Sequence, residues 1–239
     1  LKKMMAEREA LRSDDPEMKR LMAIADRAID EGAIETARNF LDKAVARVES
    51  TRSAVDDAEE TVKRKRIADA TVYARRAEAS SLIFDFAGAA ADYGKAFDLI
   101  EKWDERLRWN YKNLQAESLS ALGGAKGDPK ALQGALSAYE EVLDFIPRND
   151  HGRDWAITRN NMATVYQAIG QRELDTANME KAERILRDSL AIFEREKDIE
   201  NTASAHHNLG NVLLTIGERK SDVETLEQAA VEMRNALAM

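Results

Sequence analysis

The sequence contains no cysteine, only three prolines and only eleven glycines in 239 residues. Without cysteine the chain cannot form a disulfide or bind a metal through thiolates, and it fits a reducing compartment such as the cytoplasm. Scarce proline, together with abundant Ala, Glu, Leu, Arg and Lys, favours helix throughout. We therefore expect an all-α protein.

The chain also lacks an excess of positive charge and lacks long apolar runs. Its formal net charge is -8, so it is poorly suited to neutralising phosphates, and nucleic acid is not an expected partner. No apolar run approaches the roughly 20 residues needed to cross a bilayer, so we expect no membrane span. A hydrophobic fraction of 44% is nevertheless enough for a continuous core.

Motifs for catalysis and metal binding are missing as well. The segment from Gly88 to Lys95 resembles a phosphate-binding loop, but it has one residue too many between its glycines and Ala96 where a hydroxyl would hold magnesium. His206 and His207 are adjacent, so a helix points them about 100° apart and they cannot share a zinc ion. We predict no enzymatic activity, no cofactor and no metal site.

What the sequence does contain is a series of helical segments joined by short links. Asp15 followed by Pro16 predicts a helix N-terminus, and that helix stops near Gly32 and has an antiparallel partner over 33–49. A capping-box pattern then predicts a long, mostly charged helix over about 54–84. Because short links force antiparallel neighbours, we expect helical hairpins. Further helices are predicted near 87–102, 104–122, 129–146, 153–169, 177–195, 199–216 and 222–239.

The C-terminal half matches itself at an offset of 47 residues. A period in this range indicates stacked supersecondary units, none of which can bury its apolar face alone. The glycines of the repeat are interpreted as breakers between helices. The matching sets are Gly123, Gly170 and Gly217; Ala135, Ala182 and Ala229; and Leu143, Leu190 and Leu237.

The second helix of each hairpin carries Ala, a large residue four positions later and a small residue three further on. Examples are Ala37, Leu41, Ala44; Ala89, Tyr93, Ala96; Ala135, Tyr139, Val142; Ala182, Leu186, Ser189; and Ala229, Met233, Ala236. This pattern resembles the tetratricopeptide repeat (TPR), in the extended form of kinesin light chains and bacterial multidomain proteins. The resemblance implies a right-handed superhelix of stacked hairpins, an α-solenoid. We expect an N-terminal helix over 1–14, hairpins over 15–103 and three extended repeats over 104–239.

Polar residues recur at the same offset on the first helix of each repeat. The resemblance implies that first helices line a concave face, where asparagine can hydrogen-bond the backbone of an extended peptide. The same side chains could instead bond to neighbouring helices, and both interpretations stay open. Neither these positions nor Glu117 carries a cation, so a C-terminal carboxylate is not the expected ligand. The candidate peptide-binding residues are Asn113, Asn160, Asn161, Thr164, His207, Asn208 and Asn211.

These observations predict non-catalytic binding of a protein or extended peptide. The last helix offers Val223, Leu226 and Met233 without an evident polar cap, although the inner units of a solenoid need capping. We therefore expect further repeats, an effector domain, or self-association through uncapped ends. The alternative function is a structural scaffold or self-association module for effector domains in a longer polypeptide.

Overall fold

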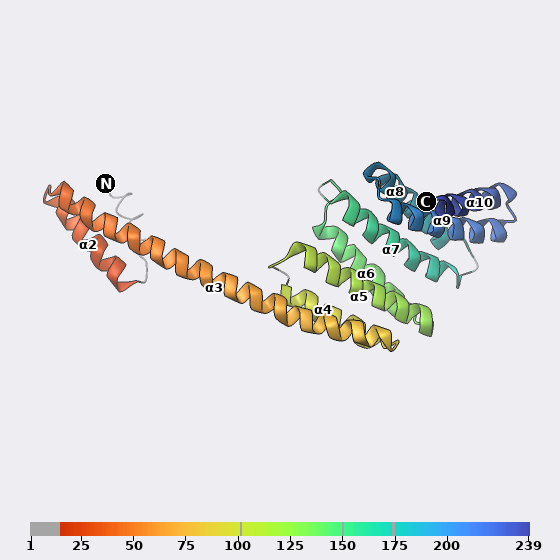
Figure 1. Ribbon diagram of the computed structural model, residues 1–239, viewed down its shortest axis with the longest axis horizontal. Helices are drawn as coiled ribbons and strands as arrows, with labels where there is room; N and C mark the ends of the chain where they lie inside the picture. Colours follow the sequence, from red (N-terminus) through yellow and green to blue (C-terminus); the bar gives the residue numbers. More distant parts are fainter. Residues whose placement is uncertain (1–14, 101, 150, 174) are drawn as a thin grey trace. The chain divides into compact units, whose positions relative to one another are not determined.

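The computed structural model describes residues 15–239, except 101, 150 and 174 (Figure 1). The helix predicted over 1–14 lies outside the described residues. Within the described part the chain forms helices and no strand, so the all-α prediction is confirmed. The helices are α2 (Pro16–Asp30), α3 (Ile34–Leu82), α4 (Phe86–Ile100), α5 (Glu105–Lys126), α6 (Pro129–Phe145), α7 (Gly152–Gly170), α8 (Ala177–Glu196), α9 (Ile199–Lys220) and α10 (Val223–Ala238).

Contacts between residues divide the chain into two compact units, Leu1–Lys65 and Arg66–Met239. The boundary falls inside α3 and does not coincide with the end of the predicted N-terminal region at residue 103. The three-part division made from the sequence therefore stays a prediction. Each unit is described by itself below.

In the first unit, α2 lies along the beginning of α3. The side chain of Asp15 accepts hydrogen bonds from the amides of Glu17 and Met18, with proline at the first helical position, as the sequence predicted. The same carboxylate accepts from Arg47 Nε of α3 at 2.7 Å. The turn between the helices is made by Gly32, whose φ of 74° favours glycine. Leu21, Ala25 and Ala28 form the buried face of α2.

The predicted break between a helix over 33–49 and a second one over 54–84 is wrong. α3 is one helix from Ile34 to Leu82. The reason is that this stretch contains neither glycine nor proline, and Ser and Thr lower helix propensity by only a fraction of a kcal/mol each. Every residue from 45 to 62 is exposed, so this part of α3 is helical without packing against a core.

In the second unit, neighbouring helices form a stack of hairpins. The part of α3 after residue 65 pairs with α4, where Ala70, Ala77 and Ala89 pack with Tyr93 in one buried cluster. The following pairs are α5 with α6, α7 with α8 and α9 with α10. The large residues fill the space between pairs, because Tyr139 of α6 packs in one cluster with side chains of α5 and α7. Small residues therefore meet large ones in the packing that the repeat pattern predicted.

The repeated glycines at 123 and 217 do not end their helices, which corrects their interpretation as breakers. α5 continues to Lys126 and α9 continues to Lys220. A Cβ on Gly123 would lie 2.6 Å from Cγ of Leu132, which stands in the first turn of the next helix. These glycines thus let the two helices of a hairpin approach closely. The three glycine pairs are Gly123 with Leu132, Gly170 with Met179 and Gly217 with Leu226.

Two arginines, also 47 residues apart, join one repeat to the next. Arg172 donates to the carbonyl of Gly123 at 2.9 Å, and Arg219 donates to the carbonyl of Gly170 at 2.9 Å and to that of Gln171 at 3.4 Å. The last carbonyls of a helix have no partner within it, and a cation there also interacts favourably with the helix dipole. We call these contacts of Arg172 and Arg219 the arginine clasps.

Candidate functional site

The seven candidate residues all lie on α5, α7 and α9, the first helices of three successive hairpins. α5 contacts α7, and α7 contacts α9, so residues that are far apart in the sequence come together across the repeats. We call this set the polar ladder. It comprises Asn113 on α5; Asn160, Asn161 and Thr164 on α7; and His207, Asn208 and Asn211 on α9.

Asn113 is buried, and both ends of its amide are engaged. Its Nδ2 donates to the carbonyl of Trp109 at 2.9 Å, and its Oδ1 accepts from the hydroxyl of Thr158 at 3.2 Å. Trp109 Nε1 donates to the same hydroxyl at 3.0 Å. This network joins α5 to α7, so in this structure Asn113 bonds to a neighbouring helix.

Asn160 and Asn208 make the corresponding link between α7 and α9. Asn208 Nδ2 donates to Asn160 Oδ1 at 3.4 Å. Asn160 is buried, whereas Asn208 is half-buried. One member of the pair is thus enclosed by the repeats, and the other retains contact with solvent.

Asn161 reaches back to α5, where its Nδ2 donates to Glu117 Oε1 at 2.9 Å. The side chain of Glu117 keeps contact with solvent, yet the protein around it raises its pKa by desolvation. Thr164 is half-buried, and its hydroxyl donates to the carbonyl of Asn161 at 2.7 Å.

The last part of the ladder is on α9. His207 is exposed, and its Nε2 lies 3.0 Å from Nδ2 of the half-buried Asn211. Asn211 also accepts from the hydroxyl of Thr215 through its backbone carbonyl, at 3.1 Å. The ladder thus has buried members that hold repeats together and more exposed members whose amides and imidazole remain within reach of solvent.

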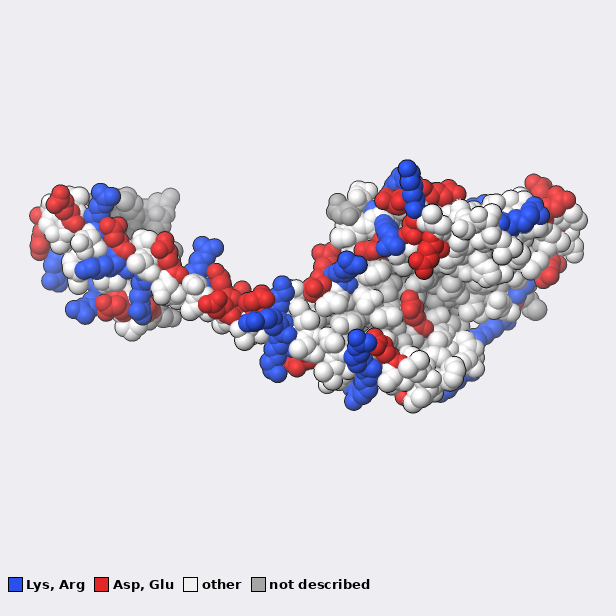
Figure 2. Space-filling view, viewed as in Figure 1, with Lys and Arg blue, Asp and Glu red and all other residues white. Residues whose placement is uncertain are grey.

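The described part of the chain contains neither a candidate metal-binding group nor a candidate membrane-spanning helix. No group of three or more His, Cys, Asp or Glu residues there could hold a metal ion. Among the same residues, no helix combines the length and the apolar character that crossing a membrane requires. On the face of residues 66–239 in view in Figure 2, Lys and Arg are scattered among Asp and Glu and form no continuous basic surface.

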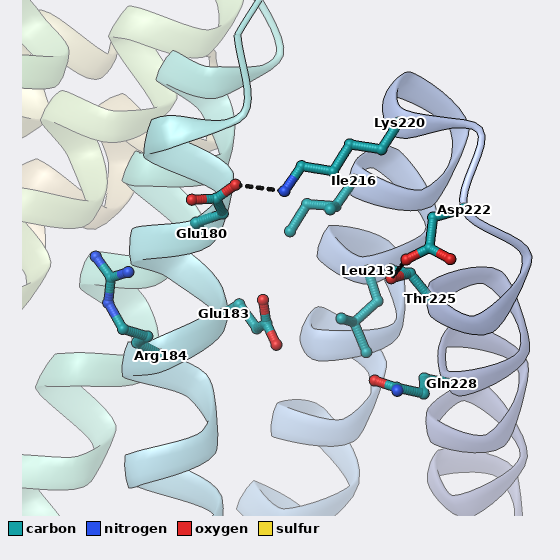
Figure 3. A pocket seen from close by; sticks show the side chains of 9 residues that line it. All are labelled: Glu180, Glu183, Arg184, Leu213, Ile216, Lys220, Asp222, Thr225 and Gln228. Atoms are coloured by element: carbon teal, nitrogen blue, oxygen red, sulfur yellow. Dashed lines mark hydrogen bonds and ion pairs between the residues drawn. The ribbon is translucent and has the colours of Figure 1, made fainter.

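A hollow of about 330 Å³ lies between α8 and the α9–α10 hairpin (Figure 3). At the edge of this hollow, Lys220 Nζ lies 2.7 Å from Glu180 Oε1, and this contact lowers the pKa of Glu180. The other carboxylates also have donors, since Glu183 accepts from Arg187 at 2.9 Å and Asp222 accepts from Thr225. The carboxylates of the hollow therefore already have donors within the protein. The hollow was not predicted from the sequence.

No family model matches this sequence, and no curated protein matches it either. The folded chain does resemble a solved structure, that of a Podosopora anserina protein described as a kinesin light chain with nearly identical TPR-like repeats. The TM-score is 0.50 at 17% identity, over 92% of this chain and 97% of that one. The chain has a TPR-like fold. The all-α solenoid that the sequence implied is confirmed, and this likeness shows the fold alone.

Proposed function

We propose that residues 66–239 bind a protein segment in an extended conformation along α5, α7 and α9, without catalysing a reaction. The observation that carries this proposal is the polar ladder, which places partly exposed amides at one repeat offset on helices that contact one another. An amide offers both a donor and an acceptor, so a row of them can pair with successive peptide groups of an extended backbone.

The more exposed members of the ladder are the ones we assign to the ligand. These are Asn161, Thr164, His207, Asn208 and Asn211. Glu117 adds one exposed carboxylate beside Asn161. A carboxylate accepts charge-assisted hydrogen bonds from ammonium and guanidinium groups, which favours a ligand with a lysine or arginine at this point. The net charge of -8 also favours a basic ligand, because it attracts positive charge over longer distances.

Affinity capture from the native extract, followed by mass spectrometry, tests this assignment. The wild-type chain is compared with a double variant, Asn161→Ala with Asn208→Ala, and with Asn235→Ala, which removes an exposed amide of α10 outside the ladder. A ligand of the ladder is retained by wild type and Asn235→Ala and reduced by the double variant, which still unfolds cooperatively. Captured proteins that bind all three equally would place the site elsewhere.

A second candidate function, a self-association scaffold, is favoured by the outer surface of α10. Val223 is 67% exposed and Leu237 is 88% exposed, and Ala229 is the one residue of α10 that is buried. Exposed apolar surface on the last hairpin favours docking of another hairpin or a second copy. Light scattering over a range of concentrations tests this function. A mass that rises with concentration and returns to monomer in Val223→Ser with Leu237→Ser supports it, and a constant monomer contradicts it.

A further inference from the structure

Cations gather in a second hollow, which lies between α7 and α8 of the middle repeat. Its volume is about 230 Å³, and no other repeat has its combination of residues at the corresponding positions. One of them, Arg184, also belongs to the lining of the hollow of Glu180 and Lys220, where Figure 3 shows its side chain on the side of α8 away from Lys220. The lining residues are Arg159 and Tyr166 of α7 and Lys181, Arg184, Ile185 and Asp188 of α8.

The charge of Arg159 is only loosely compensated. The nearest carboxylate in an ion pair with it is Asp188, whose Oδ2 lies 3.8 Å from Nη2. The Nε of Arg159 is buried and has no hydrogen-bond acceptor. The pKa of Arg159 is lowered by burial, as expected for a partly desolvated cation. Arg148 brings another positive charge close, since both guanidinium groups stand over the ring of Trp155 at 5.0 and 5.2 Å.

Lys181 and Arg184 form no ion pair with Asp188, the carboxylate that lines the hollow. Lys181 Nζ lies 3.4 Å from the amide oxygen of Asn178 and 5.6 Å from the centre of the Tyr166 ring. The two carboxylates on the far side of Arg184 are already engaged elsewhere. Glu180 accepts from Lys220 at 2.7 Å, and Glu183 accepts from Arg187 at 2.9 Å. Asp188 is thus the one carboxylate that lines the hollow beside these three cations, and Glu180 interacts electrostatically with Arg184 from outside it.

In the flanking repeats, the residue at the position of Arg159 has a carboxylate within ion-pair distance. The position of Arg159 is occupied by Lys112 in the preceding repeat and by His206 in the following one. Lys112 Nζ lies 2.5 Å from Glu141, and His206 Nδ1 lies 2.6 Å from Glu232, so each has a close carboxylate. The positions of Lys181 and Arg184 hold Gly134 and Ser137 in the preceding repeat, and Gln228 and Val231 in the following one.

We propose that the hollow of Arg159, Lys181 and Arg184 binds an oxyanion on a side chain of a partner protein, either a phosphate monoester or a carboxylate. An oxyanion accepts charge-assisted hydrogen bonds from ammonium and guanidinium groups, and it supplies negative charge to a hollow whose lining has three cations and one carboxylate. The site uses the surface between α7 and α8 rather than the polar ladder, so it stands whether or not the ladder binds a peptide.

The probes that test this proposal are blocked tripeptides Ala-X-Ala, in which X is phosphoserine, glutamate or serine. They are titrated at constant ionic strength into the ¹⁵N-labelled chain while the arginine Nε–H and Trp155 indole signals are recorded. We expect saturable shifts of the Arg159 and Trp155 signals with phosphoserine or glutamate and none with serine. Binding by both anionic peptides identifies a general oxyanion site, and binding by phosphoserine alone identifies a phosphate site.

The matched variant replaces Lys181 by Gln and Arg184 by Ser, which are the residues of the flanking repeats. We expect it to weaken binding by roughly tenfold or more, the order expected for losing charge-assisted hydrogen bonds. The control, Lys126→Gln with Arg75→Ser, makes the same change of charge at exposed positions and should bind as wild type does. If the double variant fails to unfold cooperatively, Arg184→Ser alone is used.

The proposal is overturned if neither anionic peptide shifts these signals more than the serine peptide does. It is also overturned if the control loses as much affinity as the Lys181 and Arg184 variant, because binding would then reflect overall charge.

Discussion

Residues 66–239 and residues 15–65 are both helical and both rich in charge, yet residues 66–239 repeat the packing of small against large residues from hairpin to hairpin, whereas residues 15–65 have it once, at Ala37, Leu41 and Ala44. In residues 66–239, each hairpin buries its alanines against large side chains such as Tyr139 and Leu186. In residues 15–65, every side chain of α3 from 45 to 62 is exposed. The stretch of α3 from 45 to 62 is therefore helical without a core of its own, between packed segments on either side, whereas the stack requires the repeated alternation of residue size.

The largest effect is expected from removing a core side chain of the stack. Phe193 is fully buried, so Phe193→Ala should lower the free energy of unfolding by about 3–5 kcal/mol. Val55 is 53% exposed on α3, and Val55→Ala should change it by less than about 0.5 kcal/mol. Urea unfolding measures both. Equal losses in the two variants would mean that α3 is packed as the stack is.

Breaking an arginine clasp should have the next largest effect. Arg219→Ala leaves the carbonyls of Gly170 and Gln171 without their inter-repeat donor, so we expect a loss of about 2 kcal/mol in unfolding free energy. The control is Arg75→Ala, which removes an exposed ion pair with Glu78 and should cost less than about 1 kcal/mol. Chemical unfolding compares them, and an Arg219→Ala chain as stable as the control would show that the clasp contributes nothing.

Gly123 and Gly124, which are adjacent in α5, should respond to substitution by alanine with opposite changes in the free energy of unfolding. Gly123→Ala places a Cβ against Leu132 and should cost about 1–2 kcal/mol through overpacking. Gly124 has no atom within 4 Å of such a Cβ, so Gly124→Ala should stabilise the chain by about 0.5–1 kcal/mol through helix propensity. Thermal unfolding separates the two. Stabilisation by both substitutions would contradict the close approach of α5 and α6.

The smallest effect concerns pH and the Arg76–Asp92 pair. Hydrogen bonds from Arg76, at 2.5 and 2.6 Å, lower the pKa of the buried Asp92 carboxyl below its usual 3.8. A carboxyl whose pKa is lowered by folding stabilises the fold above that usual value, and the contribution is lost as the pH falls through the folded-state pKa.

Asp92→Asn should therefore cost about 1 kcal/mol at pH 7, and the difference from wild type should shrink as the pH falls below 3.8. Urea unfolding at pH 7, 5, 4 and 3 follows this difference. A difference that stays constant over the whole range would show that the ionised carboxylate is not what stabilises the pair.

The sequence predicted most helix boundaries in the stack to within a few residues, because prolines, capping aspartates and loops mark them. It failed where one residue type has two uses. Gly123 and Gly217 can break a helix or allow close packing, and only the partner helix decides between these roles. Ser53 can cap a helix or lie inside one, and nothing after residue 49 stops α3.

The candidate site was predictable in its placement but not in the role of each residue. The repeat offset put the polar ladder on three first helices, as the structure has it. Whether an amide faces solvent depends on distant partners, such as Thr158 for Asn113, and these are not visible in a local pattern. The hollow of Arg159, Lys181 and Arg184 did leave a signal, because two of its cations have uncharged residues at the same offset in both flanking repeats.

The most direct test of the contrast between the two regions is hydrogen–deuterium exchange along the whole chain, read by mass spectrometry. If the hairpins of 66–239 form one stack joined by buried clusters and arginine clasps, their core amides exchange slowly and together. Amides of α3 from 45 to 62, which have no core to open, exchange much faster. Equal protection of α3 from 45 to 62 and of α5, α7 and α9 would contradict this account.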